Sequence, residues 1–397
     1  MTAQVDAPPR FLLLLPPAPA ASDADLIKSA YGDSIRQVLT EVALASQESK
    51  AAAVLEIALA CPHLLSTTEK SSFSRYATTQ EVLARTYRLV CTIAARDCIN
   101  VEDVDGVDVR VILVAWEAES HEKPDPPGYI PTLQDLSSSG RQWQYAFGVE
   151  DDAGTAMVKA FVQARGEAAA ANDIPRAQQR RAGPGHSSEN IPCIAVGGTF
   201  DHLHIGHKLL LTMTVFAVLD QKVSLDTQRS VIIGITGDEL LKNKKFAEHL
   251  ESWHERQKSV HTFVEATFNT SSAGSPATSS EEVNSDAVNG HYINTTFPNG
   301  LVLRCVEIGD PFGPTITERD IDALVISAET RAGGKAVNDK RVEQGWHPLT
   351  VLEVDVLDGD TSNPQSGERP QTQDFAGKIS STEIRRKLAK KGHSSSL

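Results

Sequence analysis

Apolar runs and amphipathic stretches alternate along this chain in two series, one in each half. In the first half, strand-like runs and stretches of helical periodicity occupy residues 11–15, 24–44, 52–60, 79–95, 107–116 and 153–171. In the second half, strand-like runs lie at 191–196, 230–235, 301–308, 323–327 and 349–356, and helical stretches lie near 206–219, 238–244, 252–268, 317–320 and 334–345. Strands that alternate with helices form parallel sheets. The pattern predicts an α/β protein whose C-terminal half is a Rossmann-like doubly wound parallel sheet, preceded by a smaller α/β N-terminal domain.

Composition marks the boundary between the two halves. The segment AANDIPRAQQRRAGPGHSSENIP is polar and rich in Gly, Pro and Arg, as linkers are. We therefore expect an N-terminal α/β extension over residues 1–172, a linker over 173–189 and a second domain over 190–397. Polar insertions at 270–299 and 359–377 interrupt the second domain, and both are predicted to be mobile loops.

The composition also excludes several functional classes. The 397-residue chain is 40% hydrophobic, as ordinary globular proteins are, and carries a formal charge of −14. Such an acidic chain does not offer the basic face that general nucleic-acid binding needs. No apolar run approaches the roughly 20 residues of a membrane-spanning helix, and the five scattered cysteines indicate reduced, buried thiols. We expect a cytoplasmic protein that binds neither nucleic acid nor membrane.

One stretch, VGGTFDHLHIGHKLLL over residues 196–211, carries most of the candidate chemistry. Gly197 and Gly198 end a strand at a point where a Cβ would keep a ligand away from the backbone. His204 and His207 then lie three residues apart on the first turn of the next helix, where free N–H groups and the helix dipole favour an anion. The pattern predicts a phosphate-binding site.

Capping and metal binding are the alternative interpretations of these histidines. A histidine near a helix start is commonly a cap or a satisfied surface residue. His202, His204 and His207 would be zinc ligands together with Cys193, but that cysteine lies inside the preceding strand, and the sequence offers no suitably placed second cysteine or carboxylate. We therefore expect no zinc.

Basic and polar side chains follow two later strands of the same half. Lys242, Lys244 and Lys245 come after the second strand, at the sheet edge where open α/β sheets bind ligands. The segment SAETRAGGKAVNDKR, after the fourth strand, adds a polar group that consists of Ser327, Glu329, Thr330, Arg331, Lys335, Asn338 and Arg341. Its adjacent glycines suggest backbone that passes close to a ligand.

The last segment with candidate chemistry is GKISSTEIRRKLAKK. Ser380 and Glu383 have the spacing of a capping box, which predicts a helix start. The hydroxyls and Arg385 also make a second anion site, which faces the first if both helices begin at one sheet edge. The two interpretations are compatible.

Together, GGTFDHLHIGHKLLL and ISSTEIR resemble the paired signature of the HxGH nucleotidylyltransferase superfamily. Within it, TGDELLKNKK, DPFGPTITERDIDALVISAETRAGGKAVNDKR and GKISSTEIRR are similar to phosphopantetheine adenylyltransferases of the archaeal and eukaryotic (fungal) type. The resemblance covers residues 190–391; for the rest there is only a general similarity to the N-terminal extension of fungal members. It implies transfer of AMP from ATP to 4′-phosphopantetheine, giving dephospho-coenzyme A and pyrophosphate, with Mg²⁺ and by direct in-line attack without a covalent intermediate. Asp201 fits the GTFD turn of the family and would orient that loop or the metal.

The resemblance also implies roles for individual residues. Thr199 and His207 would contact the acceptor phosphate and the α-phosphate, and His204 would hold the nucleotide phosphates. Lys242 or Lys244 would neutralise the reacting phosphates. The ATP site would consist of Gly197, Gly198, Phe200, His204, Gly206, His207, Ser380, Ser381, Thr382 and Arg385. The acceptor substrate would be bound by Thr199, Lys242, Ser327, Glu329 and Arg331.

The sequence leaves two other functions open. One is a cytidylyl- or adenylyltransferase of the same superfamily with a different phosphorylated acceptor, such as glycerol phosphate or a flavin precursor. The other is a catalytically silent nucleotide-binding scaffold whose N-terminal half recruits partners, although the intact histidines and the ISST block argue against silence. For the N-terminal half we predict a folded module that supports stability or associates with other enzymes of coenzyme A biosynthesis.

Overall fold

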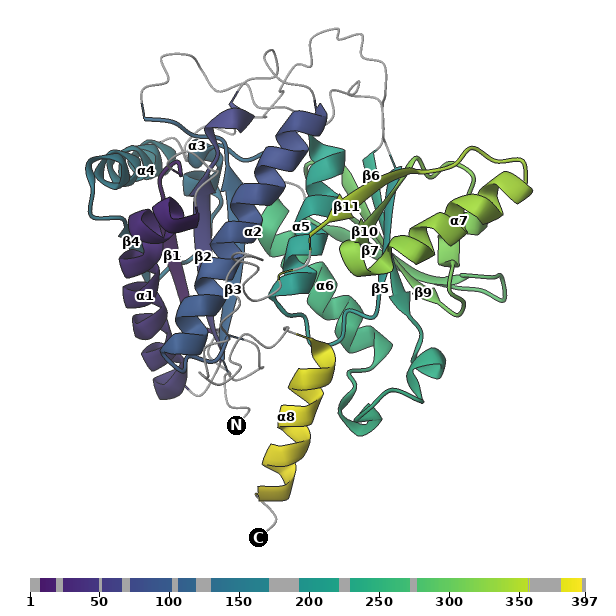
Figure 1. Ribbon diagram of the computed structural model, residues 1–397. Helices are drawn as coiled ribbons and strands as arrows, with labels where there is room; N and C mark the ends of the chain where they lie inside the picture. Colours follow the sequence, from purple (N-terminus) through teal and green to yellow (C-terminus); the bar gives the residue numbers. More distant parts are fainter. Residues whose placement is uncertain are drawn as a thin grey trace, which may run out of the picture.

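The computed structural model describes residues 8–18, 24–49, 52–65, 72–101, 106–118, 130–170, 193–220, 229–271, 277–355, 357 and 380–394. The predicted linker at 173–189 and the insertion at 359–377 lie outside the described residues. The strands form two sheets, one in each half of the chain (Figure 1). None of the helices in these segments is both long enough and apolar enough to cross a membrane.

A four-stranded parallel sheet forms the N-terminal half, in the order β3-β2-β1-β4. Its strands are β1 (Arg10–Leu15), β2 (Ala53–Ala60), β3 (Val107–Val114) and β4 (Tyr145–Gly148). Its helices are α1 (Ala24–Ser49), the 3₁₀ turn η1 (Pro62–Leu64), α2 (Ser72–Arg96), α3 (Leu133–Ser138) and α4 (Asp152–Ala170). Leu13 of β1 packs in one core with α1 and α2, whereas Leu12 packs in another with α3 and α4. Because both faces are covered, β1 is apolar along almost its whole length.

A seven-stranded mixed sheet forms the C-terminal half, in the order β11-β10-β5-β6-β9-β8-β7. Its strands are β5 (Cys193–Gly198), β6 (Arg229–Thr236), β7 (Ser279–Asn284), β8 (His291–Thr296), β9 (Leu301–Ile308), β10 (Ala323–Ser327) and β11 (Thr350–Val354). Strands β11, β10, β5, β6 and β9 are parallel, and β8 and β7 extend the sheet with antiparallel pairing. The chain continues from β5 to β6 and β9 on one side and to β10 and β11 on the other. The topological switch point therefore lies between β5 and β10.

Helices cover both faces of this second sheet, which confirms the predicted α/β fold. The helices are α5 (Ile205–Leu219), α6 (Trp253–Phe268), α7 (Arg331–Glu343) and α8 (Ser381–Ser394), with 3₁₀ turns η2 (Asp238–Leu241), η3 (Ala247–His249), η4 (Gly313–Ile316) and η5 (Ala328–Thr330). Helix α7 packs on one face through Val337, and α5 and α6 pack on the other. Helix α8 stands out from the body of the molecule and approaches it with its N-terminal turn (Figure 1).

The two halves share one hydrophobic core. A single buried cluster joins residues of β1, β2, β3, α1 and α2 to residues of α5, α6 and the C-terminal sheet. Helices α2 and α5 lie side by side between the two sheets (Figure 1), and the rings of Tyr76 and Phe216 have centroids 6.3 Å apart. The N-terminal half is therefore packed against the very helix that carries the two histidines.

Two ion pairs cross the same boundary. Arg75 on α2 donates through Nε to Oδ1 of Asp220 at 2.9 Å, and both side chains are buried. Burial raises the pKa of Asp220 to about 6, an effect that Arg75 opposes. Lys208 on α5 donates through Nζ to Oδ1 of Asp108 at 2.6 Å and to the carbonyl O of Val109 at 2.9 Å. These charges fix α5 against the N-terminal half.

The structure differs from the sequence pattern in several places: α3 is not predicted, and residues 238–244, predicted to be helical, form only the 3₁₀ turn η2 over 238–241. Residues 279–296 lie in the insertion predicted to be a loop, but they form the β7–β8 hairpin. This prediction is wrong because β7 is an exposed edge strand made of polar residues, without the apolar run that marks a buried strand. The strand β4 is also not predicted, because it is only four residues long and Tyr145 at its start is 64% exposed. Residues 317–320 are predicted to be helical, but the helical turn η4 ends before them, at Ile316. It begins at Gly313 because Pro314 favours the start of a helical turn.

Candidate functional site

The candidate site lies where β5, β6 and β10 end, at the switch point of the C-terminal sheet. Strand β10 pairs with β5 through Val325 and Val196, so Ser327 lies level with Gly198. A Cβ built on Gly197 would meet no atom of the described residues within 4 Å. A ligand therefore has open access to this backbone, at the place where open α/β sheets bind their ligands.

The loop that joins β5 to α5 has a strained backbone. Phe200 and His202 adopt φ values of 52° and 46°, in the left-handed region that non-glycine residues rarely occupy. The Phe200 ring is fully buried over Gly198, where an added Cβ would come within 3.0 Å of it. The backbone N–H of His202 donates to Oε2 of Glu251 at 2.6 Å, and its Nε2 donates to the carbonyl O of His249 at 2.8 Å. Packing and hydrogen bonds together hold the turn in one shape.

His204 and His207 stack on each other at the start of α5. Their ring centroids are 3.9 Å apart with an interplanar angle of 18°, and the Phe200 ring lies 5.4 Å from that of His207. Gly206 leaves room for the His204 ring, which would lie 3.2 Å from a Cβ there. His204 is the N-cap residue of α5, yet its side chain makes no capping hydrogen bond. The capping interpretation is therefore wrong for His204.

Both stacked imidazoles are neutral near pH 7. Burial, with smaller contributions from Lys208 and His202, lowers the pKa of His204 to about 4. Burial and the neighbouring His204 hold the pKa of His207 well below its usual range. Within the described part of the chain, neither Nδ1 atom has a hydrogen-bond partner, although both are buried. Buried polar atoms without partners are uncommon, so both Nδ1 atoms have unused hydrogen-bonding capacity.

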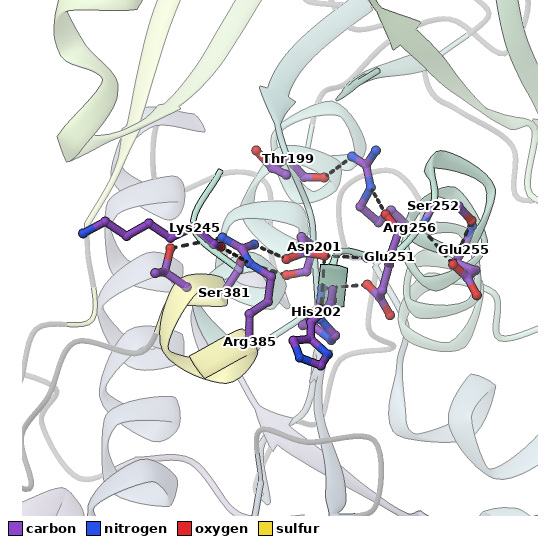
Figure 2. A network of polar contacts seen from close by, with 12 residues as sticks. Thr199, Asp201, His202, Lys245, Glu251, Ser252, Glu255, Arg256, Ser381 and Arg385 are labelled. Carbon is purple, nitrogen blue, oxygen red and sulfur yellow. Dashed lines mark hydrogen bonds and ion pairs between the residues drawn. The ribbon is translucent and has the colours of Figure 1, made fainter. Parts of the chain in front are cut away.

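The start of α8 contacts the same loop, so the two sequence motifs come together (Figure 2). Ser381 donates through Oγ to the carbonyl O of Asp201 at 2.8 Å, and the buried Arg385 pairs through Nη1 with Oδ2 of Asp201. Arg385 also donates through Nε to the carbonyl O of Lys245 at 3.1 Å and through Nη2 to Thr382 Oγ1 at 3.2 Å. Ser380 caps α8 by accepting from the backbone N–H of Glu383, as the capping box predicts.

A second buried arginine, Arg256, supports the loop from the other side (Figure 2). Its guanidinium donates to the carbonyl O of Thr199 at 2.7 Å, to the carbonyl O of Glu251 at 3.0 Å and to Oδ1 of Asp238 at 2.6 Å. The backbone N–H of Glu251 in turn donates to Oδ1 of Asp201 at 3.0 Å. Both carboxylate oxygens of Asp201 thus accept from protein donors, which suits orientation of the loop.

Arg256 and Glu251 are not predicted from the sequence. Helix α6 itself is visible from the capping box of Ser252 and Glu255, which the structure contains. Nothing local to Arg256 shows its role, because Thr199 and Asp238 lie 57 and 18 residues away in the sequence.

The predicted lysines follow β6 and the SAET group follows β10, at the sheet edge where the site lies. Lys242 is 65% exposed and pairs with Glu239, and Lys244 is also exposed. Ser327 and Thr330 cap the short turn η5 reciprocally. Arg331 pairs with Glu353 through Nε at 2.6 Å. Glu329 is exposed in the same turn.

Arg341, which the sequence groups with these residues, has a structural role instead. It is buried, and its guanidinium donates to the carbonyl oxygens of Thr315, Glu318, Arg319, Ile321 and His347. It fixes the segment before β10 to α7. The expectation that Arg341 joins the ligand site is wrong, because all its donors face backbone carbonyls.

The arrangement suits a phosphorylated ligand. The connection from β5 into α5 combines an open glycine backbone, a helix N-terminus and two stacked imidazoles, and exposed lysines follow the neighbouring strand β6. Such fixed donors stabilise negative charge without reorganisation when charge develops. The site therefore has the components for phosphate transfer by positioning and charge stabilisation.

Family models match both halves of the chain. Residues 1–185 match a domain of unknown function, DUF8446, and residues 195–387 match the model described as cytidylyltransferase-like. The boundary between the two matches falls close to the start of β5.

Several curated proteins are similar to the C-terminal half. An uncharacterised protein of Schizosaccharomyces pombe is 36% identical over 196 residues, and a phosphopantetheine adenylyltransferase of Saccharomyces cerevisiae is 35% identical over 194 residues. Each alignment covers 49% of this chain and 48% of the relative, so the match spans about half the length of these relatives. A phosphopantetheine adenylyltransferase of Methanopyrus kandleri is 30% identical over 168 residues, which are 42% of this chain and 81% of that protein.

Proposed function

This chain belongs to the phosphopantetheine adenylyltransferase family through its cytidylyltransferase-like C-terminal half, and on that premise we propose that it transfers AMP from ATP to 4′-phosphopantetheine. The products are dephospho-coenzyme A and pyrophosphate. The acceptor phosphate attacks the α-phosphate directly, in line with the departing pyrophosphate, and no covalent enzyme intermediate forms.

The observation that carries this proposal is the stacked pair of neutral histidines at the start of α5. Their buried Nδ1 atoms have no partner among the described residues, and both residues follow the open backbone of Gly197 on the connection from β5 into α5. Neutral imidazoles donate hydrogen bonds to phosphate oxygens while the charge on those oxygens is redistributed. Holding both phosphates at this edge makes an otherwise bimolecular reaction effectively unimolecular.

We assign the roles that the resemblance to the family implies for the matching motif positions. Thr199 and His207 bind the acceptor phosphate and the α-phosphate, and His204 binds the nucleotide phosphates. The first turn of α8 and Arg385 bind the β- and γ-phosphates, which requires Arg385 to exchange part of its contact with Asp201 for the nucleotide. Lys242 or Lys244 reaches the reacting phosphates from the segment that follows β6.

The other residues of the two motifs and of the SAET segment complete the proposed substrate sites. The backbone at Gly198 and Gly206 and the ring of Phe200 shape the nucleotide site, and the hydroxyls of Ser380, Ser381 and Thr382 lie at the start of α8. We place the pantetheine acceptor against Ser327, Glu329 and Arg331, at the end of β10.

Mg²⁺ is proposed to accompany ATP. It binds few protein carboxylates when phosphate oxygens are available and keeps several of its waters. Both carboxylate oxygens of Asp201 already accept hydrogen bonds, from Glu251 and Arg385. Asp201 therefore need not bind Mg²⁺ directly, which fits a metal ion held mainly by phosphate oxygens and water. Asp201 therefore holds the loop, and Mg²⁺ supplies positive charge to the phosphates.

For the N-terminal half we propose a supporting role. It buries one face of α5 and ties Lys208 and Asp220 through ion pairs. Association with other enzymes of coenzyme A biosynthesis stays a prediction, as does a cytoplasmic location.

Acceptor dependence tests the proposed reaction. The full chain is incubated with ATP, Mg²⁺ and 4′-phosphopantetheine, and in parallel with glycerol 3-phosphate or riboflavin 5′-phosphate, while pyrophosphate release is followed. We expect release only with 4′-phosphopantetheine, together with formation of dephospho-coenzyme A. Release only with another acceptor would replace this function with a different nucleotidyl transfer, and no release with any acceptor would favour the silent scaffold.

The His207→Ala variant tests the assignment of the histidines. Removing one preorganised donor costs roughly a hundredfold or more in kcat. His347→Ala is the matched control, because His347 is exposed and distant from the loop in sequence. Unchanged turnover in His207→Ala would contradict the assigned role.

A further inference from the structure

A second group of chemically active side chains lies where α6 begins beside the β7–β8 hairpin. His254 is in the first turn of α6, Glu282 is on β7 and His291 is on β8. Oε1 of Glu282 lies 3.4 Å from Nε2 of His254 and 2.9 Å from Nε2 of His291. The three potential ligand atoms all lie within 4.8 Å of one another. Three segments of the chain thus converge on one point.

Glu307 and Trp253 fix the orientation of the His291 ring. Its Nδ1 is 2.5 Å from Oε2 of Glu307 on the neighbouring strand β9, and the Trp253 ring centroid lies 4.5 Å from its own. A carboxylate that accepts from one imidazole nitrogen directs the other nitrogen toward a metal, an arrangement that metal-binding histidines almost always have. Glu307 holds the ring so that Nε2 points at Glu282.

We propose that His254, Glu282 and His291 bind a zinc ion through Nε2, Oε1 and Nε2. Zinc bonds of about 2.1 Å in tetrahedral geometry place ligand atoms about 3.4 Å apart, close to the separations found here. Two imidazoles with one carboxylate suit zinc, whereas Mg²⁺ prefers oxygen ligands throughout. His254 and Glu282 are 65% and 51% exposed, so solvent completes the fourth position.

The zinc ion would link the β7–β8 hairpin to the start of α6. The adjacent Trp253 donates through its backbone N–H to Oδ2 of Asp238 at 3.2 Å, and Asp238 binds Arg256, which holds the carbonyl O of Thr199. The metal site is therefore connected to the support of the phosphate loop through two side chains. This zinc site is separate from the histidines of the loop, for which the sequence argues against zinc.

Zinc titration of the full chain tests the site. The protein is stripped with EDTA and exchanged into metal-free buffer, then titrated with ZnCl₂ by calorimetry, and the bound metal is counted by mass spectrometry. The double variant His254→Ala/His291→Ala is compared with His347→Ala, which removes an exposed histidine elsewhere. The loop histidines and the cysteines are present in both proteins, so any zinc they bind is common to both titrations.

We expect one equivalent more of bound zinc in the wild type and in His347→Ala than in the double variant. Glu307→Gln, which keeps all three ligands, should weaken that equivalent about 10- to 100-fold. Far-ultraviolet circular dichroism establishes that the variants are folded. Equal stoichiometry and affinity in the double variant and in His347→Ala would overturn the proposal.

Discussion

The contact between Lys208 and Asp108 leads to the most direct test of how the N-terminal half supports the site. Lys208 follows His207 on α5, and its side chain is only 6% exposed, while that of Asp108 is 28% exposed. Although burial opposes it, Lys208 and Arg110 hold the pKa of Asp108 well below its usual range. Asp108 is therefore charged at pH 7, and Asp108→Asn leaves two cations without their shared counter-charge.

The magnitude follows from the exposure of the pair. Breaking a fully buried ion pair costs about 3–5 kcal/mol, whereas an exposed pair contributes about 0–1 kcal/mol. Lys208 is buried, but Asp108 is more than one quarter open to solvent, so we expect Asp108→Asn to lower the unfolding free energy by about 2 kcal/mol. The urea midpoint should fall by roughly 0.5–1 M.

Urea unfolding followed by tryptophan fluorescence measures this change. Asp97→Asn is the matched control, because Asp97 pairs with Arg36 inside the N-terminal half, where their side chains are 27% and 37% exposed. The control should lose less than about 1 kcal/mol. A double-mutant cycle of Asp108→Asn with Lys208→Met should give a coupling of at least about 1 kcal/mol. If Asp108→Asn unfolds within about 0.5 kcal/mol of the wild type, the ion pair does not fix α5.

Three further predictions concern the shared core and the histidines. Arg75→Met leaves the buried carboxylate of Asp220 without this counter-charge and should lower the free energy of unfolding, measured in urea, by about 3 kcal/mol. Adding Asp220→Asn to the same chain should recover part of that stability. Burial lowers the pKa of His204 to about 4 from 6.5, so the unfolded chain binds more protons than the folded chain between these two pH values. The free energy of unfolding should therefore fall by about 3 kcal/mol as the pH drops from 6.5 to 4. His204→Asn should reduce this pH dependence, and an unchanged dependence would contradict the burial argument. A protein of residues 190–397 alone exposes the apolar face of α5 and should aggregate or melt at a lower temperature than the full chain, and equal melting temperatures would show that the shared core does not support the C-terminal half.

The parts of the fold that follow from the sequence are those with a local hydrophobic signal. β9 and β10 begin and end where the strand-like runs at 301–308 and 323–327 predict; β10 is almost continuously apolar because it is a buried parallel strand, and β9 carries enough buried apolar residues to be recognised. β7 has no such signal, since almost all its side chains are exposed and its pairing with β8 depends on backbone hydrogen bonds. Polar edge strands resemble loops when only composition is considered.

The residues of the candidate site also divide into those with a local sequence signal and those without one. The glycines, His204, His207 and the start of α8 stand out because their spacing has a local chemical meaning. Arg256 does not, because two of its acceptors, Thr199 and Asp238, belong to separate segments that only the folded sheet brings to α6. The cluster of His254, Glu282 and His291 is hidden for the same reason, since it depends on a hairpin that the polar composition conceals.

The left-handed backbone at Phe200 and His202 has a consequence for the kinetics of binding. Each such residue costs of order 1 kcal/mol or more, and burial of the Phe200 ring and the hydrogen bonds of His202 offset that cost while the chain folds. The backbone of the loop is therefore already ordered without a ligand, and a ligand that binds there loses no affinity to ordering it. The loop between β5 and α5 should therefore add no slow ordering phase to ligand association, because its backbone conformation is set before any ligand is present.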